Sequence, residues 1–374
     1  MTRKNNDTLV VLTPAFPRHE SETYWVPSQQ LMVKALKRNY PEVNILVLSI
    51  LYPATTDIFH WHGVKVIPFN GIRLRQLRRP LRWYRVWQAL RAIRRENKLI
   101  GILSFWCGEC ALIGKYFGQF FRVPHCCWIC GQDAKKENKL VRFIRPKPVE
   151  LAAMSPFLAD HFFKNHGIRP AWIIPNAVDT ASFPLPPVGG RDIDILGAGS
   201  FEPLKQYDLF TKAVGAIHKQ FPAIKAYHCG MGVEKEKVGK LIDQLGLQNN
   251  LFLLGGKPQE EVLQLMQRTK IFLHTSRYEG FSTVCLEALY AGAHVISFCY
   301  PLRDAVPHWH VVNNLEEMIS KAMELLQDPA MTYPSVKLYD MDDSAKTMMR
   351  LLRLSAVEDN AVDVPSPAER SVEV

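Results

Sequence analysis

Residues 172–201, "WIIPNAVDTASFPLPPVGGRDIDILGAGSF", decide how this chain divides. The segment leaves an apolar run, passes through a stretch rich in Pro and Gly, and enters a fresh apolar run at residue 192. Pro and Gly interrupt regular structure and are common in linkers between domains. The chain has 374 residues, and single hydrophobic cores stop growing at roughly 250–300 residues. The pattern therefore predicts two domains that meet near residues 180–190.

Apolar runs that predict strands alternate with helical patterns on both sides of this segment. Such repetition is typical of a parallel sheet covered by helices on both faces. In the first half, strands are expected at 8–16, 43–51, 64–68, 99–105, 124–130, 149–154 and 171–175, and a helix at 26–40. In the second half, strands are expected at 192–199, 224–229, 251–254, 270–274 and 293–298, and helices at 206–219, 233–245, 259–267, 283–291 and 315–327.

These elements predict an α/β protein with two doubly wound, Rossmann-like domains that face a central cleft. The expected limits are 1–185 for the first domain and 186–340 for the second. A closing helix is expected at 341–357, and the polar composition of 358–374 is typical of a disordered tail.

Positive charge is concentrated in one segment of the first domain. The net charge is +10, and residues 73–95 contain nine arginines and no acidic residue, with Trp83, Tyr84 and Trp87 between them. A basic segment with interleaved aromatic residues favours contact with an anionic membrane surface or a phosphate-bearing partner. A solvated basic helix is the alternative, and we expect no nucleic-acid partner.

The apolar residues give no sign of membrane insertion. No window reaches the ~18–20 consecutive apolar residues of a spanning helix, and the polar start lacks a secretory signal pattern. We therefore expect a cytoplasmic protein that makes peripheral contact with the inner face of the membrane.

Four cysteines have the spacing of a structural zinc site: Cys107, Cys110, Cys127 and Cys130 form two C-x2-C pairs. The alternative is a core-facing helix at 109–121 followed by a buried strand. Cysteines in such elements usually behave as small buried apolar residues, so we expect no metal. A nicotinamide cofactor is not expected either, because neither half has G-x-G-x-x-G after a strand.

Residues 277–292, "RYEGFSTVCLEALYAG", place Glu279 and Glu287 on either side of a predicted helix start. Ser282 is a favourable N-cap residue, and the N–H groups of a helix N-terminus attract phosphate. A carboxylate accepts hydrogen bonds from two vicinal hydroxyls. The pattern predicts a diphosphate bound between two sugars. A loop carboxylate and a surface charge are the alternative.

Two further loops are expected to reach the same cleft, because open α/β sheets bind ligands at the carboxyl ends of their strands. Lys205 follows the first strand of the second domain, where an ammonium would stabilise a diphosphate leaving group. Gly230, in "CGMG", follows the next strand and lets the backbone approach a ligand closely.

The order of these motifs resembles a known family. "GAGSFEPLKQYDLF", "HCGMGVEKEKVGKLIDQLGLQNNLFLLGG" and "FLHTSRYEGFSTVCLEALYAG" look like the donor-binding domain of glycosyltransferase family 4 (group 1), whose members are retaining enzymes of GT-B fold. "IIPNAVDTASF" is similar to the family's interdomain linker. The resemblance is strong over residues 173–298 and weaker before them.

The resemblance implies a role for each matching residue. Glu279 and Lys205 would be catalytic, with Glu279 on the donor sugar and Lys205 on the phosphate charge. Glu287 would hold the nucleotide ribose, and the backbone of Ser282 and Thr283 the diphosphate. The remaining donor-binding residues would be Gly280, Phe281, Ser200 and Gly230. Ser200 stands where the family often has an arginine.

In the first domain, the resemblance points to two loops. "ESETYW" at 20–25 is similar to an S-E-T-F element and would place Glu22 and Thr23 beside the diphosphate or the acceptor. Gln132 and Asp133 would supply the contacts of a second loop. In that loop Cys130 stands at a position where many members have histidine.

The resemblance implies metal-independent, retaining transfer of a hexosyl unit. The donor would be a nucleotide diphosphate sugar and the acceptor a glycan or a lipid-linked chain in polysaccharide or cell-surface glycan biosynthesis, with no cofactor. Residues 1–185 would bind the acceptor and residues 186–340 the donor. Two alternatives are an epimerase or phosphorylase on the same fold and a non-catalytic, nucleotide-sugar-binding partner of another transferase.

Overall fold

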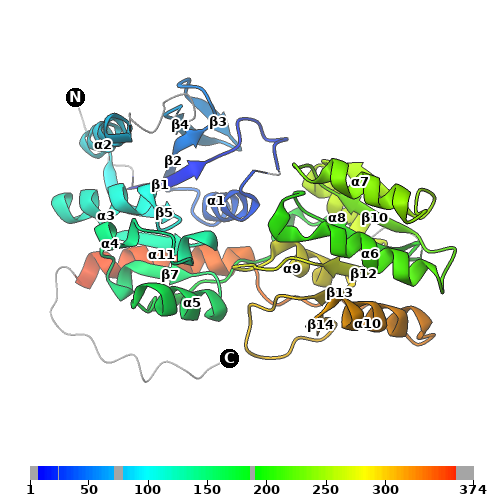
Figure 1. The fold of residues 1–374 in the computed structure, drawn as a ribbon. Coiled ribbons are helices and arrows are strands. Elements are labelled where there is room, and N and C mark those ends of the chain that lie inside the picture. The colour runs from blue at the N-terminus through cyan, green and yellow to red at the C-terminus, as the bar shows by residue number, and fades with distance from the viewer. Residues whose placement is uncertain (1–6, 24, 71–78, 186–189, 359–374) are drawn as a thin grey trace.

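The computed structural model describes residues 7–23, 25–70, 79–185 and 190–358, with side chains described up to residue 353. Two sheets lie side by side, one in each half of the chain, with helices packed around them (Figure 1). The two doubly wound units predicted from the sequence are confirmed. The expected boundary at residue 186 and the expected tail after 358 lie outside the described residues.

The first sheet is parallel except for one short edge strand, β3, which runs antiparallel to β4. In spatial order its strands are β3 (Phe59–Trp61), β4 (Val64–Pro68), β2 (Asn44–Tyr52), β1 (Asp7–Ala15), β5 (Lys98–Phe105), β6 (His125–Ile129), β7 (Leu151–Ala153) and β8 (Trp172–Ile173). Its helices are α1 (Pro27–Asn39), α2 (Arg79–Glu96), α3 (Glu109–Phe121), α4 (Val141–Ile144) and α5 (Pro156–His166).

Burial in the central strand β1 explains why this sheet needs helices on both faces. Leu9 and Val11 belong to one apolar cluster and Val10 and Leu12 to another, and all four are fully buried. Successive side chains of a strand point to opposite faces, so a strand that is apolar at every position must be covered twice.

The second sheet is parallel throughout. Its strands, in spatial order, are β11 (Leu251–Gly255), β10 (Ala226–Cys229), β9 (Ile193–Ala198), β12 (Thr269–His274), β13 (His294–Ser297) and β14 (Trp309–Val311). Its helices are α6 (Tyr207–His218), α7 (Lys235–Gln244), α8 (Gln259–Gln267), α9 (Thr283–Tyr290) and α10 (Leu315–Gln327).

The last helix, α11 (Met341–Glu358), returns to the first domain and lies beside α1 (Figure 1). Met341, Met348 and Leu352 are buried in the cluster that also holds Leu9 and Val11. A Cβ added at Gly101 of β5 would stand 3.2 Å from Leu352 Cδ2, so the helix packs closely onto the sheet. The chain therefore crosses between the domains twice.

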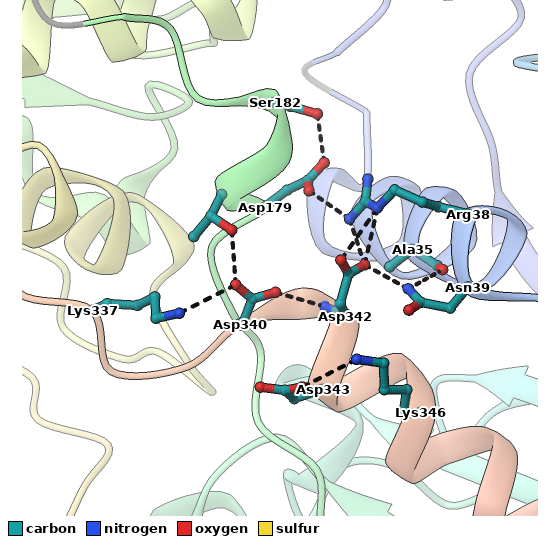
Figure 2. A network of polar contacts seen from close by, with 11 residues as sticks. Ala35, Arg38, Asn39, Asp179, Ser182, Lys337, Asp340, Asp342, Asp343 and Lys346 are labelled. Carbon is teal, nitrogen blue, oxygen red and sulfur yellow. Dashed lines mark hydrogen bonds and ion pairs between the residues drawn. The ribbon is translucent and has the colours of Figure 1, made fainter.

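A polar network joins the two crossings (Figure 2). Val178 of the outgoing segment forms a parallel bridge with Asp340 of the returning one, and Thr180 Oγ1 donates to Asp340 Oδ2 over 2.8 Å. Arg38 of α1 contacts Asp179, at 2.8 Å, and also Asp342 at the start of α11. The side chain of Asp179 is only 3% exposed. The network therefore holds both interdomain segments against α1.

Helix α2 carries much of the arginine-rich segment, of which residues 73–78 lie outside the described chain. Its arginines do not all face solvent. Arg82 is buried and pairs with Glu109 at 2.7 Å, and Arg79 pairs with the other oxygen of the same carboxylate at 2.7 Å. Trp83 Nε1 also donates to Glu109, over 2.9 Å. Arg82 is therefore part of the domain interior, whereas Arg85, Arg94 and Arg95 are exposed.

The cysteines follow the strand-helix-strand prediction. Cys110 lies in α3 and Cys127 in β6, both are buried, and Cys107 is also buried. Among the residues that the structure describes, no three His, Cys, Asp or Glu side chains are placed to hold a metal ion.

The second sheet has an edge strand that was not expected from the sequence: β14, which contains His310 and pairs with β13. His294 Nδ1 is 3.2 Å from His310 Nε2. A strand of three residues is too short for an alternating pattern to reveal it.

Candidate active site between the domains

Glu279 stands in the loop between β12 and α9, at the carboxyl end of the second sheet. Its carboxylate forms an ion pair with Lys205 and lies 3.2 Å from His274 Nε2. Burial alone would raise the pKa of Glu279, but the Lys205 ammonium and His274 hold that pKa below its ordinary value. The predicted catalytic pair is thus brought into direct contact, with Glu279 ionised.

Lys205 is positioned by a 3-10 turn, Pro203–Lys205, which follows β9. The turn is joined to the Glu279 loop at two points. Thr275 Oγ1 donates to the carbonyl of Lys205 over 2.8 Å, and the N–H of Arg277 donates to the carbonyl of Leu204 over 3.0 Å. These two hydrogen bonds therefore hold the Lys205 turn and the Glu279 loop together.

Glu287 lies inside α9 and is 5% exposed. Gln259 Nε2 donates to its Oε1 over 2.6 Å. Burial raises the pKa of Glu287 to about 7, and the bond from Gln259 partly opposes that rise. The two predicted glutamates thus occupy opposite electrostatic environments.

The N-terminus of α9 lies between these two carboxylates. Ser282 occupies the N-cap position, but its side chain caps no N–H group; Oγ instead lies 3.4 Å from His274 Nε2. Thr283 Oγ1 lies 3.2 Å from Ser28 Oγ and accepts a bond from Asn176 Nδ2. The expected side-chain cap is therefore wrong, while the Thr283 side chain joins α9 to the first domain.

Gly280 lies where the backbones of the two domains are in close contact. A Cβ there would come within 2.6 Å of the carbonyl oxygen of Cys130 and 2.9 Å of the Cα of Gly131. Ser155 Oγ donates to the carbonyl of Gly280 over 2.7 Å. Only glycine permits this contact, so any side chain at position 280 would separate the domains.

The other predicted donor-binding residues are placed differently. Ser200 is exposed in the loop after β9. Gly230 lies beside that loop, and a Cβ there would collide with the carbonyl oxygen of Gly199 at 1.9 Å. Phe281 is buried, with its ring 5.9 Å from that of Tyr339. The Phe281 side chain therefore packs in the core and is not placed to bind a ligand.

The predicted residues of the first loop are divided between two functions. Glu22 Oε2 accepts from the Arg18 N–H at 2.9 Å and from the Tyr52 hydroxyl at 3.1 Å. Thr23 Oγ1 accepts from the N–H of Gln259, in the second domain, at 3.0 Å. Glu22 thus shapes its own domain, and Thr23 reaches across to the other.

In the second loop, Gln132 is exposed but Asp133 is buried. Asp133 accepts from the N–H groups of Cys107 at 2.8 Å, Gly131 at 2.7 Å and Cys130 at 3.2 Å. Burial raises the pKa of Asp133 despite these donors. Its carboxylate holds the loop that meets Gly280 and is not directed at a ligand.

Four contacts that matter here were not found in the sequence. His274 and Gln259 touch the two glutamates, and Asn176 and Ser155 hold the α9 segment from the linker and the first domain. A buried histidine directly before "TSRYEG" was the one visible signal. The other three depend on residues more than 25 positions apart, whose proximity only the fold creates.

The chain is similar in sequence to known glycosyl transferases. Residues 185–333 match the family model described as "Glycosyl transferases group 1". The chain is 25% identical over 244 residues to the phosphatidylinositol N-acetylglucosaminyltransferase GPI3 subunit of Saccharomyces cerevisiae, covering 60% of this chain and 49% of that protein. It is 35% identical over 91 residues to the poly(glycerol-phosphate) alpha-glucosyltransferase of Bacillus subtilis, covering 24% of this chain and 13% of that protein.

The chain spans about half the length, or less, of these curated relatives. A solved structure matches over nearly all of both chains. Anabaena Alr3699/HepE, in complex with UDP and glucose, has a TM-score of 0.66 at 15% identity, covering 94% of this chain and 99% of that chain. This likeness confirms the expected two-domain GT-B fold.

Proposed function

We propose that the chain is a retaining, metal-independent hexosyltransferase of the group 1 glycosyl transferases, the family whose model matches residues 185–333. The donor is a nucleotide diphosphate sugar. The acceptor is a glycan or a lipid-linked chain in polysaccharide or cell-surface glycan biosynthesis. One observation carries the proposal: Glu279, paired with Lys205, precedes the α9 N-terminus, Glu287 lies inside α9, and Thr283 at the start of α9 contacts Ser28 of the first domain.

Each of these groups matches one part of the donor. The carboxylate of Glu287 accepts from the ribose hydroxyls, and the N–H groups at the start of α9 hold the diphosphate. Glu279 accepts from hydroxyls of the donor sugar. Lys205, already beside Glu279, supplies positive charge as the diphosphate departs.

The transfer breaks the bond between the anomeric carbon and the phosphate oxygen and forms one to the acceptor oxygen. Retention through attack on the same face brings the acceptor hydroxyl beside the departing phosphate. A phosphate oxygen then takes the acceptor proton, and the diphosphate leaves with it. The protein contributes charge and positioning to this step.

Nucleotide binding and transfer together test the proposal. Isothermal titration with UDP, GDP and ADP should show binding of at least one of them. A panel of nucleotide sugars should then show hydrolysis or transfer that is lost in Glu279→Ala. Binding of none of the three nucleotides, or undiminished transfer by Glu279→Ala, would contradict the assignment.

The acceptor side of the proposal includes peripheral contact with an anionic membrane. On α2, Leu81, Tyr84, Arg85 and Arg95 are exposed, and Phe120 at the end of the adjacent α3 is 74% exposed. Exposed apolar and basic side chains on one helix suit the boundary between headgroups and acyl chains. In the described part of the chain, no helix is long and apolar enough to cross a membrane.

Liposome co-sedimentation tests this contact. Arg85→Glu with Arg95→Glu should reduce binding to vesicles containing phosphatidylserine and leave the weak binding to neutral vesicles unchanged. Arg79 and Arg82 are unsuitable targets, because they pair with Glu109 inside the domain. Equal sedimentation of the wild type and the double variant would count against α2 as the contact.

A second candidate follows from the Saccharomyces cerevisiae relative, which is named as a subunit. On that basis the chain would bind the donor and act only beside a partner protein. Transfer by the purified single chain would exclude this alternative. Nucleotide binding without hydrolysis or transfer would support it.

A further inference from the structure

Gln259, the first residue of α8, touches both domains. Its backbone N–H donates to Thr23 Oγ1 of the first domain over 3.0 Å. Its side-chain Nε2 donates to Glu287 Oε1 of α9 over 2.6 Å. One residue thus joins a loop of the first domain to the carboxylate expected to hold the ribose.

The backbone contact satisfies a need of α8. The first N–H groups of a helix have no partner within the helix, and a side-chain oxygen at the N-cap usually accepts one of them. Here the N-cap residue is Pro258, which makes no side-chain cap. Thr23 supplies the missing acceptor from the other domain, so α8 is capped across the domain boundary.

The side-chain contact satisfies a need of Glu287. A buried carboxylate without hydrogen-bond donors is costly. Helix α9 packs against α8, β12 and β13, and Gln259 of α8 donates the hydrogen bond to Glu287. Among the described residues, no charged group shifts the pKa of Glu287. A carboxylate has roughly four lone-pair positions, so the bond from Gln259 leaves acceptors for two vicinal hydroxyls.

We propose that Gln259 is a positioning residue, which orients the Glu287 carboxylate toward the ribose and links this orientation to the first domain through Thr23. The inference rests on the proposed function, in which Glu287 binds the nucleotide. The contact between the two domains and the binding of the nucleotide then both depend on the N-terminus of α8. Loss of either contact weakens the other.

The pKa of Glu287 gives the proposal a measurable signature. Burial raises this pKa to about 7, and the Gln259 bond lowers it from the value that burial alone would give. Removal of the amide should therefore raise the pKa of Glu287 further. A role in packing alone would not predict that change.

The first experiment measures UDP, GDP and ADP affinity by isothermal titration between pH 6 and 8.5. In Gln259→Ala we expect about tenfold weaker binding, the loss typical of a hydrogen bond to a charged group, and a pH profile displaced to higher pH. Gln259→Glu should bind worse than Gln259→Ala above pH 7, because two carboxylates would then face each other. Gln264→Ala is the matched control: the same residue type, exposed, on the same helix.

The second experiment follows the Glu287 carboxyl carbon by NMR in full-length protein without nucleotide, with Glu287→Gln used for assignment. A higher pKa in Gln259→Ala than in the wild type is the expected result. If the wild type binds no nucleotide, the proposed function fails, while this titration still tests the contact. If the wild type binds nucleotide and Gln259→Ala matches it in affinity and in Glu287 pKa, the inference is overturned. Tighter binding by Gln259→Ala would also overturn it, since Gln259 would then compete with the ribose.

The link to the first domain is tested with Thr23→Val, which removes the hydroxyl at nearly constant volume, and Thr23→Ser, which keeps it. Thr23→Val should lower kcat by severalfold, and Thr23→Ser should restore most of it. In Gln259→Ala the further effect of Thr23→Val on nucleotide affinity should be smaller than in the wild type. Independent, multiplicative losses would show that the two contacts are uncoupled.

Discussion

The surroundings of Glu279 and Glu287 differ more than their shared residue type suggests. Glu279 lies against a lysine and a histidine, and its pKa is held below the ordinary value. Glu287, eight positions later, lies against one neutral amide, and its pKa is raised to about 7. Glu287 is buried and the Glu279 side chain is 15% exposed, so desolvation raises the pKa of both and the difference comes from the partners that each region supplies.

This comparison separates two tasks within one short segment. A carboxylate paired with a cation stays charged at every physiological pH and can share that cation with a departing phosphate. A carboxylate with only a neutral donor changes charge near neutrality. We therefore expect the Glu279 region to govern the rate and the Glu287 region to govern nucleotide affinity and its pH dependence.

The largest effect is expected from removing the cation beside Glu279. Lys205→Ala should lower kcat by ~10²–10³, the loss typical of one electrostatic stabiliser of a developing negative charge, with a smaller change in nucleotide affinity. Steady-state transfer kinetics check this. Lys212→Ala is the control, because that lysine pairs with Asp208 on the exposed surface of α6. Equal effects on kcat in the two variants would contradict the assignment.

The next effect concerns the other carboxylate. Glu287→Gln should weaken nucleotide binding by ~10–100-fold, as expected when a charged acceptor of hydrogen bonds becomes neutral, and should change kcat less than Lys205→Ala does. Isothermal titration and transfer at saturating donor separate the two quantities. A variant with normal affinity and a collapsed kcat would reverse the roles of the two regions.

A smaller effect is expected at His274, which lies within 3.4 Å of both Glu279 and Ser282. His274→Leu replaces the histidine at the end of β12 with an apolar residue and removes one hydrogen-bond partner of Glu279. Because Lys205 remains, we expect kcat to fall about five- to tenfold, the range of a single hydrogen bond. A loss as large as that in Lys205→Ala would mean that the histidine, and not the lysine, holds Glu279 in place.

The smallest effect is the response of stability to pH. The pKa of Glu287 in the folded protein is raised from 4.5 to about 7, so the folded state binds a proton more tightly than the unfolded state does. Its contribution is fully present below pH 4.5 and is lost as the pH rises through about 7. Wild-type Tm should therefore fall between pH 5.5 and 8 by a few degrees more than the Tm of Glu287→Gln. Parallel Tm curves would show that Glu287 titrates normally.

The sequence predicted the scaffold of this site because its elements are strongly periodic. Helix α8 was expected at 259–267 and is found there, and α9 differs by one residue at its end. Long apolar and amphipathic runs report burial directly. The edge strand β14, with three residues, has no such signal.

The partners of the site residues could not be predicted in the same way. Asp133 was expected to face a ligand, but it accepts from two N–H groups of its own loop, those of Cys130 and Gly131, and from the N–H of Cys107 after β5. Gln259 and Glu287 are 28 positions apart, and Thr23 and Gln259 are separated by 236. Sequence patterns describe which face of an element is buried, whereas these contacts depend on how two elements meet.

The return of α11 to the first domain has a consequence for engineering. The chain leaves the first domain after β8 and comes back before Met341, so the second domain is one continuous segment inserted before the last helix of the first domain. Truncation of the chain after the linker would remove α11 from the first domain and expose the apolar surface that Met348 and Leu352 cover. An exchange of the second domain between related proteins therefore needs two junctions in the chain. Asp179 and Asp340 are suitable positions for these junctions, because Val178 and Thr180, on either side of Asp179, both contact Asp340.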